Sequence, residues 1–297
     1  MTTSAMALHV RHTHQGAHHT TTGQLTPSRP ARPALPVDKH LVHRAHLRDV
    51  LPTHLTRHDD THFTVCARWP REHRLFVACD GRYTASLVLE TIRQTTLLIS
   101  HAHLGVPVGH HFVMWDLSHR LDAALLQRGA SPAEVSLDVT VTVLRRRAAL
   151  PTGMRMEMTL KMDGRPVGSG SIRFDVTSPA AYTRIRGHIP PAPQPAVLPQ
   201  PLDPRTVHHH HAQDVTLAPT TTPGQWQLRA DPANDLLFDH ANDHLPAMVL
   251  VEAAQQAAHL HTPGRPFTPS ASEMRFTRYI EFHTPCLITT HPHTTPH

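Results

Sequence analysis

The chain has 297 residues, of which 39% are hydrophobic and 17% are charged. This length suits about two domains of roughly 100 to 200 residues each, and no apolar run reaches the roughly 18 residues that would indicate a membrane span. The formal charge of +5 favours acidic partners, but only 5% of the residues are aromatic and no basic stripe is interleaved with them, which argues against nucleic acid.

The N-terminal segment, residues 1–36, is rich in His, Thr and Pro and has no continuous apolar stretch of the kind found in a signal peptide. Such a composition cannot bury enough apolar surface to offset the loss of chain entropy, so we expect a disordered tail on a cytoplasmic protein.

Neither the cysteines nor the histidines indicate a metal site. Cys66, Cys79 and Cys286 lack CxxC spacing, so a disulfide framework or a cysteine zinc site is not predicted. The histidine tract at 208–211 is expected to lie in a flexible stretch that does not fix ligand geometry. We therefore expect no metal and no cofactor.

The first folded unit is assigned to residues 37–187. A strand is predicted at 62–70, followed by a helix from about Thr84 to His103 that Gly105 and Pro107 close. Further alternating runs predict strands, with a hairpin turn at Asp163 and Gly164. These strands are expected at 111–117, 135–147, 154–164 and 166–176. The order of elements predicts an α+β layer in which one antiparallel sheet wraps one helix.

A second copy of this unit follows a proline-rich linker, residues 188–206. A strand at 224–230 and a helix within 238–261 repeat the earlier order. Aligning "LVLETIRQTT" at 87–96 with "VLVEAAQQAA" at 249–258 places Glu90 with Glu252, Arg93 with Gln255 and Gln94 with Gln256.

The second unit, residues 207–297, is shorter than the first and ends after strand-like runs at 272–282 and 286–292. At least one hairpin of its sheet is absent. The sheet is therefore either completed by another chain, which would make a homodimer, or belongs to a shortened and marginal domain. Its exposed edge could also be covered by the His-rich tails.

The amino-acid sequence of several segments resembles that of the A-factor-type γ-butyrolactone synthases of actinomycetes, which carry two hotdog units in one chain. The segments are "VHRAHLRDVL", "ARWPREHRLF", "LETIRQTTLLISHAHLGVPVGHHFVMWDL" and "DHLPAMVLVEAAQQAA". The resemblance implies two tandem hotdog units. It also implies transfer of a β-ketoacyl group from a thioester on acyl carrier protein or coenzyme A to the hydroxyl of dihydroxyacetone phosphate. The resulting ester cyclises to a phosphorylated butenolide.

The resemblance also points to two catalytic positions. A family glutamate maps onto Glu90, and a family arginine maps onto position 255, where this chain has Gln255. Gln lacks the charge and the bidentate fork of Arg. A weakened or inactive family member is therefore one of the alternatives.

The chemistry of the first helix supports a site there. Glu90, Arg93 and Gln94 are three and four residues apart and share one helix face. Partial desolvation is expected to raise the pKa of Glu90 toward that of a general base, while the helix N-terminus opposes this rise. An ion pair on a solvated face is the alternative, but the apolar neighbours favour a charged face lining a pocket between the units.

Three residues of the second copy are further substrate-binding candidates. Glu252 is either a second pocket carboxylate or a hydrogen-bonding group at the domain interface. His244 lies in the loop that opens the second helix, where Asp243 is expected to act as a helix cap. Arg278 could reach a phosphate from the second copy, or it could belong to the polar face of a strand.

Three functions remain open from the sequence. The first is acyl transfer to dihydroxyacetone phosphate by an acyltransferase. The second keeps the hotdog fold but hydrolyses a thioester or dehydrates a β-hydroxyacyl group. The third is a degenerate double hotdog that binds an acyl chain or a carrier protein without catalysis.

Overall fold

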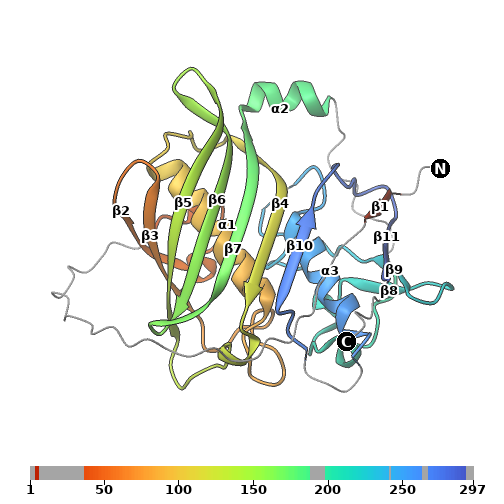
Figure 1. Ribbon diagram of the computed structural model, residues 1–297. Helices are drawn as coiled ribbons and strands as arrows, with labels where there is room; N and C mark the ends of the chain where they lie inside the picture. The colour runs from red at the N-terminus through yellow and green to blue at the C-terminus, as the bar shows by residue number, and fades with distance from the viewer. Residues whose placement is uncertain (1–3, 7–36, 188–197, 241, 263–266, 292–297) are drawn as a thin grey trace.

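A computed structural model describes residues 4–6, 37–187, 198–240, 242–262 and 267–291 of the chain. The larger of its two sheets has seven strands in the order β10-β4-β7-β6-β5-β3-β2, and the smaller has four in the order β1-β11-β9-β8 (Figure 1). The strands and helices of the first unit are β2 (Pro52–Arg57), β3 (His62–Trp69), α1 (Ala85–Ala102), β4 (His111–Leu121), β5 (Ala133–Arg147), β6 (Leu150–Met162), β7 (Arg165–Thr177) and α2 (Pro179–Arg186).

The central helix α1 begins and ends as the sequence predicts. Thr84 caps its N-terminus by accepting from the backbone N–H of Leu87, and Gly105 follows its end with a φ of +72°. Leu87, Leu89 and Ile92 are fully buried between the helix and the sheet. Burying such a side chain contributes roughly 1.5 to 3 kcal/mol, so the sheet and the helix stabilise each other.

The four long strands β4 to β7 form the wall that curves around α1 (Figure 1). Asp163 and Gly164 both have positive φ, +48° and +78°, which is the backbone of a two-residue hairpin turn between β6 and β7. The predicted turn is therefore confirmed. Gly170 of β7 has no side chain where Ile92 packs against the strand, and this lets α1 lie close to the sheet.

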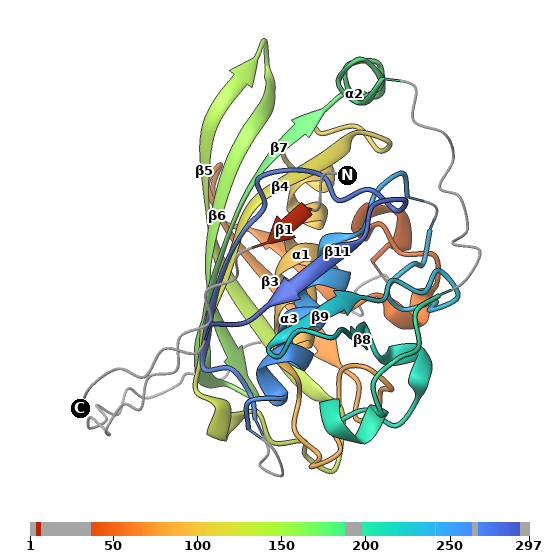
Figure 2. The same cartoon turned by 90° about the vertical axis from the view of Figure 1, so that its right-hand side faces the viewer.

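The second unit repeats the first on a smaller scale. Its helix α3 lies beside α1 on the same side of the large sheet, and the small sheet covers α3 (Figure 2). The elements of the second unit are β8 (Leu217–Pro219), β9 (Gln225–Leu228), α3 (Ala247–His259), β10 (Ala271–Arg275) and β11 (Cys286–Thr289).

The strand β10 does not join its own unit's small sheet. It pairs with β4 of the first unit in antiparallel register, with Ala271 opposite Arg120 and Arg275 opposite Asp116. The sequence predicts a short second sheet that is completed by another chain, stays marginal, or has its edge covered by the tails, and strand β1 (Ser4–Met6) of the N-terminal tail does pair with β11. The structure adds an arrangement that the sequence did not predict, in which a strand of the second unit extends the sheet of the first. A homodimer stays a prediction.

Two segments assigned to the tail and the linker form part of the fold. Ser4–Met6 is strand β1, which pairs in parallel with β11, whereas the other tail residues, 1–3 and 7–36, lie outside the described residues. Within the linker, 188–197 also lies outside them. The backbone N–H of Leu202 donates to Leu217 and the Pro199 carbonyl accepts from Arg229, so the end of the linker packs on the second unit.

Candidate active site

Glu90 lies at the centre of a buried charge cluster. Arg93 holds both carboxylate oxygens, with Nε 2.8 Å from Oε2 and Nη2 2.9 Å from Oε1. Gln94 donates to Oε1 at 2.7 Å, and the Nε of Arg44 donates to the same oxygen at 3.1 Å. The carboxylate has no exposed surface. A buried helix therefore carries a Glu and an Arg because they neutralise each other together with a second arginine.

The pKa of Glu90 is lowered, whereas the sequence predicted that burial would raise it. Burial alone raises its pKa, but the guanidinium groups of Arg44 and Arg93, together with their hydrogen bonds, outweigh burial and lower the pKa to about 2. A carboxylate with this pKa is a poor proton acceptor near neutral pH. Whether Glu90 is catalytic stays a prediction, but in this structure its observed contacts are with the two arginines and Gln94.

Arg44 connects this cluster to the second unit. Its Nη1 donates to the carboxylate of Asp239 at 3.0 Å and to the backbone carbonyl of Leu236 at 3.3 Å. The side chain of Arg44 is only 6% exposed, so it needs both acidic partners to offset the loss of hydration. The ion pairs Arg44–Glu90 and Arg44–Asp239 thus tie the two repeats together.

The Gln94 side chain binds the backbone of the segment that precedes β2. Its amide nitrogen donates to the Asp49 carbonyl at 2.8 Å, and its amide oxygen accepts from the Leu51 N–H at 2.9 Å. Both bonds are buried and fix the segment that precedes β2 against α1. Gln94 therefore satisfies backbone groups and orients Glu90.

The second unit contains a similar network, in which His209 is the cation and neutral Gln255 stands at the position of Arg93. Glu252 accepts from Gln256 Nε2 at 3.0 Å, and His209 Nε2 lies 2.8 Å from its Oε1. Gln256 binds the Asp214 carbonyl and the Thr216 N–H in the way that Gln94 binds Asp49 and Leu51. His209 therefore stands where Arg44 stands in the first unit.

Gln255 lies in this second network. Its amide nitrogen donates to the hydroxyl of Ser86 at 2.7 Å, and this hydroxyl donates to Glu252 at 2.6 Å. Gln255 is 8% exposed. The catalytic role predicted for position 255 stays a prediction, but the side chain present here links α3 to α1.

Arg44 and His209 were not predicted as site residues, and the flexible stretch expected for the tract 208–211 is wrong. His208 ends a 3₁₀ helix (Pro204–Val207), and His209 is buried against Glu252. The signal that could have revealed this is the repeat of "VDKHLVHRAHLRDV" at 37–50 as "LDPRTVHHHHAQDV" at 202–215. This repeat places His209 at the position of Arg44.

A cavity of about 1090 Å³ lies between the two units. The first-unit residues that line it come from the segment 39–45, which includes Arg44, from α1, the loop 108–110, β4, β7 and α2. The second-unit residues lie at 236–250 and 276–280. Among the residues proposed from the sequence, Arg93, His244 and Arg278 line this cavity. Glu90, Gln94, Glu252 and Gln255 do not, because each is buried in one of the two networks.

The cavity combines an apolar wall with cationic and imidazole groups. Its apolar lining includes Leu97, Phe112, Met114, Phe174 and Met248. Lys39 and Arg278 also line it, and within the described residues Arg278 has no acidic partner. Such a lining can hold an apolar chain at one side and an anionic group at the other.

His244 presents an imidazole to the cavity. Its Nδ1 lies 2.6 Å from Asp243 Oδ1, while Asp243 also binds Tyr182 and Arg186. The prediction that Asp243 caps α3 is wrong. Pro246 occupies the cap position, and the Asp243 carboxylate is engaged by these three side chains. The network fixes the orientation of the His244 ring at the cavity wall.

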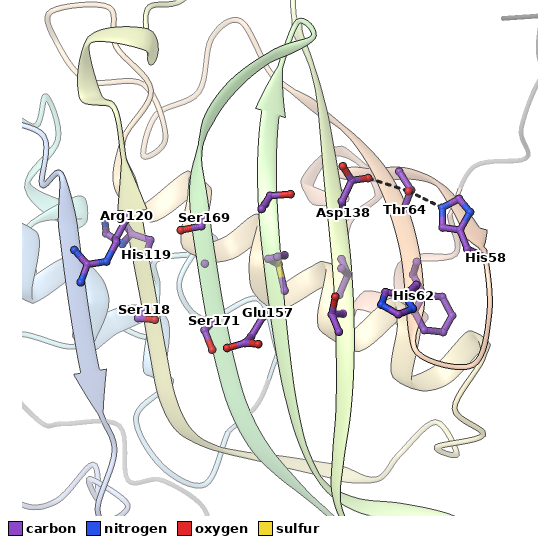
Figure 3. A pocket seen from close by; sticks show the side chains of 16 residues that line it. His58, His62, Thr64, Ser118, His119, Arg120, Asp138, Glu157, Ser169 and Ser171 are labelled. Atoms are coloured by element: carbon purple, nitrogen blue, oxygen red, sulfur yellow. Dashed lines mark hydrogen bonds between the residues drawn. The ribbon is translucent and has the colours of Figure 1, made fainter. Parts of the chain in front are cut away.

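A second hollow of about 600 Å³ lies on the outer face of the large sheet, away from α1 (Figure 3). His58, Thr64 and Asp138 form a hydrogen-bonded row at one side of it, and Ser118, Ser171 and Glu157 lie near the other. No residue proposed from the sequence lines this hollow. The cavity between the units is therefore the candidate active site.

Two further observations concern the described residues alone. Within them, no group of three or more His, Cys, Asp or Glu side chains could hold a metal ion. In the same part of the chain no helix is long and apolar enough to cross a bilayer.

Two central helices, each wrapped by antiparallel strands, together with a cavity between the repeats define a double hotdog protein. The family model of the A-factor biosynthesis hotdog domain matches residues 25–178 and 192–295. The chain belongs to this family. A 2-oxo-3-(phosphooxy)propyl 3-oxoalkanoate synthase of Streptomyces virginiae is 43% identical over 86% of this chain and 87% of its own length. Synthases of the same description from Streptomyces coelicolor and Streptomyces griseus are 36% and 34% identical, over 86% and 85% of this chain and 82% and 84% of their own lengths.

The His209–Glu252 pair should make stability depend on pH. Burial lowers the pKa of His209, but the hydrogen bond and the charge of Glu252 outweigh burial and raise it above 6.5. The stability from this pair is therefore complete below the ordinary histidine pKa and is lost as the pH rises through the raised value. We expect wild type to lose more unfolding free energy between about pH 6 and about pH 9 than His209→Gln does.

The measurement is chemical denaturation of both proteins at the two pH values. His211→Gln is the matched control, because His211 is exposed in the same tract. Equal pH dependence of wild type and His209→Gln would contradict the expected contribution.

Proposed function

We propose that this chain transfers a β-ketoacyl group from an acyl thioester to the hydroxyl of dihydroxyacetone phosphate. The product is the ester named in its relatives, a 2-oxo-3-(phosphooxy)propyl 3-oxoalkanoate. The observation that carries the proposal is the inter-unit cavity, which joins an apolar wall to a set of cationic side chains. An acyl chain and a phosphate are the two chemical groups that such a cavity accommodates.

The residues of the cavity are assigned by their charge and partners. Arg278 is the phosphate-binding group, because it lines the cavity and no carboxylate in the described part of the chain neutralises it. Arg93 polarises the thioester carbonyl, since its guanidinium lines the cavity while Glu90 fixes its orientation from behind. Glu90 thereby acts through Arg93.

The chemical step is a displacement at the acyl carbon. The hydroxyl oxygen forms a C–O bond with the thioester carbonyl carbon, the C–S bond breaks, and the thiol leaves after the hydroxyl proton has been taken by a base. The methylene between the two carbonyl groups of the ester can then condense with the ketone of the dihydroxyacetone unit. Loss of water from this adduct gives a phosphorylated butenolide.

The acyl donor, location and assembly are further parts of the proposal. Acyl carrier protein and coenzyme A present the same pantetheine thioester, and the cationic cavity suits the negative charge of either. A cytoplasmic location and a homodimer remain expectations.

The test is incubation of the purified chain with a β-ketoacyl thioester and dihydroxyacetone phosphate, followed by mass spectrometry. We expect the phosphorylated ester or butenolide to form only when dihydroxyacetone phosphate is present. Release of free acid or an enoyl product without the acceptor would instead identify a hotdog thioesterase or dehydratase. Thioester binding without any product would identify an acyl-binding protein.

A lapsed synthase is tested in the same assay. Because the Gln255 side chain is hydrogen-bonded to Ser86 and does not line the cavity, we expect the wild-type chain to be active without a substitution at this position. Activity that appears only in Gln255→Arg would contradict this.

A further inference from the structure

Two histidine rings meet edge to edge beside the cavity. The Nε2 of His43 lies 2.9 Å from the Nε2 of His101, and the Nδ1 of His101 lies 2.8 Å from the backbone carbonyl oxygen of Val106. His43 lines the cavity, and His101 lies behind it on α1. Both rings pack edge-on against Phe112.

The Val106 carbonyl sets the proton positions in both neutral rings. A carbonyl oxygen only accepts, so the Nδ1 of His101 carries the hydrogen and its Nε2 is a bare acceptor. The Nε2 of His43 must then be the donor between the rings. The Nδ1 of His43 is consequently left with a free lone pair, and within the described residues it has no hydrogen-bond partner.

Both rings are held neutral by their surroundings. Burial, followed by the charge of Arg93, lowers the pKa of His43 to about 3, and burial lowers the pKa of His101. Arg93 is the strongest charge acting on His43, and both side chains line the same cavity. The cavity therefore has a hydrogen-bond acceptor and a carbonyl-polarising donor in the same region.

We propose that Nδ1 of His43 takes the proton of the attacking hydroxyl and that His101 shares it. This inference rests on the proposed function. As the C–O bond forms and the C–S bond breaks, the hydroxyl proton passes to Nδ1 of His43 while the Nε2 hydrogen of His43 passes to Nε2 of His101. His101 is then doubly protonated and remains bonded to the Val106 carbonyl. Reversal of the two transfers returns the proton to the departing thiolate.

Like Glu90, His43 has a pKa too low for it to hold a proton near neutral pH, so it acts only as the first member of a relay that passes the proton on to His101. A proton kept on His43 would add a positive charge that the Arg93 guanidinium disfavours, whereas the relay moves the charge to the ring behind it. His244 differs in this respect, because its Nδ1 is held by an Asp243 carboxylate that also anchors Tyr182 and Arg186. We assign proton transfer to His43 because a second ring, His101, can take the charge from it, and His244 has no such ring bonded to it among the described residues.

Two substitutions of His43 each keep an amide near one of its two nitrogens. His43→Gln retains an amide group that can reach the position of Nε2 and bind His101, but it has no acceptor in place of Nδ1. His43→Asn places an amide near Nδ1 and loses the bond to His101. His46→Gln is the matched control, since His46 is exposed in the same segment.

We expect His43→Gln to lower kcat of the transfer by at least about 100-fold with little change in the KM of the thioester. His43→Asn should lose a similar share of activity, because neither carboxamide can accept the hydroxyl proton, and His46→Gln should match wild type. Unfolding curves of all variants are recorded first, so that a folding defect is not read as a catalytic one.

A second readout does not depend on activity. Long-range proton–nitrogen NMR spectra of the histidine rings, with His43 and His101 assigned by comparison with their variants among the 30 histidines, should show hydrogen on Nε2 of His43 and on Nδ1 of His101. Hydrogen on Nδ1 of His43 would overturn the proposal.

The outcomes also distinguish this inference from the proposed function. Wild type that forms no transfer product would refute the proposed function, whatever the tautomers are. Wild type that is active while His43→Gln is equally active would refute only the proton relay. A rise in the KM of the thioester at unchanged kcat would place His43 at the acyl donor and would likewise overturn the assignment.

Discussion

Arg93→Met is expected to lower kcat/KM for acyl transfer by about 100- to 1000-fold. Arg93 is the guanidinium that lines the cavity from α1, and Glu90 holds it by two hydrogen bonds of 2.8 and 2.9 Å. Methionine preserves most of the chain length but removes the donors that polarise a carbonyl. Steady-state kinetics with a β-ketoacyl thioester and dihydroxyacetone phosphate measure the effect.

The fold should tolerate this change, because Glu90 keeps Arg44 as its buried partner. Arg184→Met is the matched control, since Arg184 is exposed on α2 and does not line the cavity. Arg93→Met with wild-type kinetics would mean that Arg93 only balances the charge of Glu90. The assignment of Arg93 as the group that polarises the thioester carbonyl would then be refuted.

Glu90→Gln is expected to destabilise the protein by about 3 to 5 kcal/mol. The substitution keeps the shape of the side chain but leaves the buried Arg44 with Asp239 as its remaining acidic partner among the described residues. It also frees Arg93, so activity should fall along with stability. Chemical denaturation gives the change in unfolding free energy, and transfer kinetics give the change in activity.

The same carboxylate should make wild type sensitive to acid. The pKa of Glu90 is about 2 in the folded protein and 4.5 as its ordinary value. Its contribution to stability is therefore complete above the ordinary value and is lost as the pH falls toward 2. Glu90→Gln should lack this part of the acid dependence.

Glu134→Gln provides the comparison for an exposed ion pair. Glu134 pairs with Arg68, and both side chains are 60% exposed, so its loss should change the unfolding free energy by less than about 1 kcal/mol. If Glu90→Gln and Glu134→Gln lower the unfolding free energy by the same amount, the buried cluster does not contribute the stability assigned to it.

Local pattern was sufficient to predict the elements of the first unit. The helix of the first unit, the strands that wrap it and the turn at Asp163 and Gly164 depend on capping residues, period-two alternation and turn chemistry, which are written within a few residues of each other. The pairing of β10 with β4 could not be predicted in this way. Alternation defines the faces of a strand but does not identify its neighbour.

The candidate site was predicted in part. The spacing of Glu90, Arg93 and Gln94 correctly placed them on one helix face, and their mutual hydrogen bonds confirm it. The pKa of Glu90 was misjudged because the decisive charge, Arg44, comes from a segment distant in sequence. An arginine is usually exposed, so composition alone gave no reason to place it inside.

The pairing of β10 with β4 also links the integrity of the cavity to the protection of a sheet edge. Without β10, the edge of β4 would present a row of unpaired backbone donors and acceptors to other chains. The cavity residues 276–280 follow β10 directly, so the same strand positions Arg278 and Tyr279. Detachment of this one short strand would displace the cavity residues and expose an unpaired strand edge at the same time. Loss of function and onset of aggregation would then share a single structural cause.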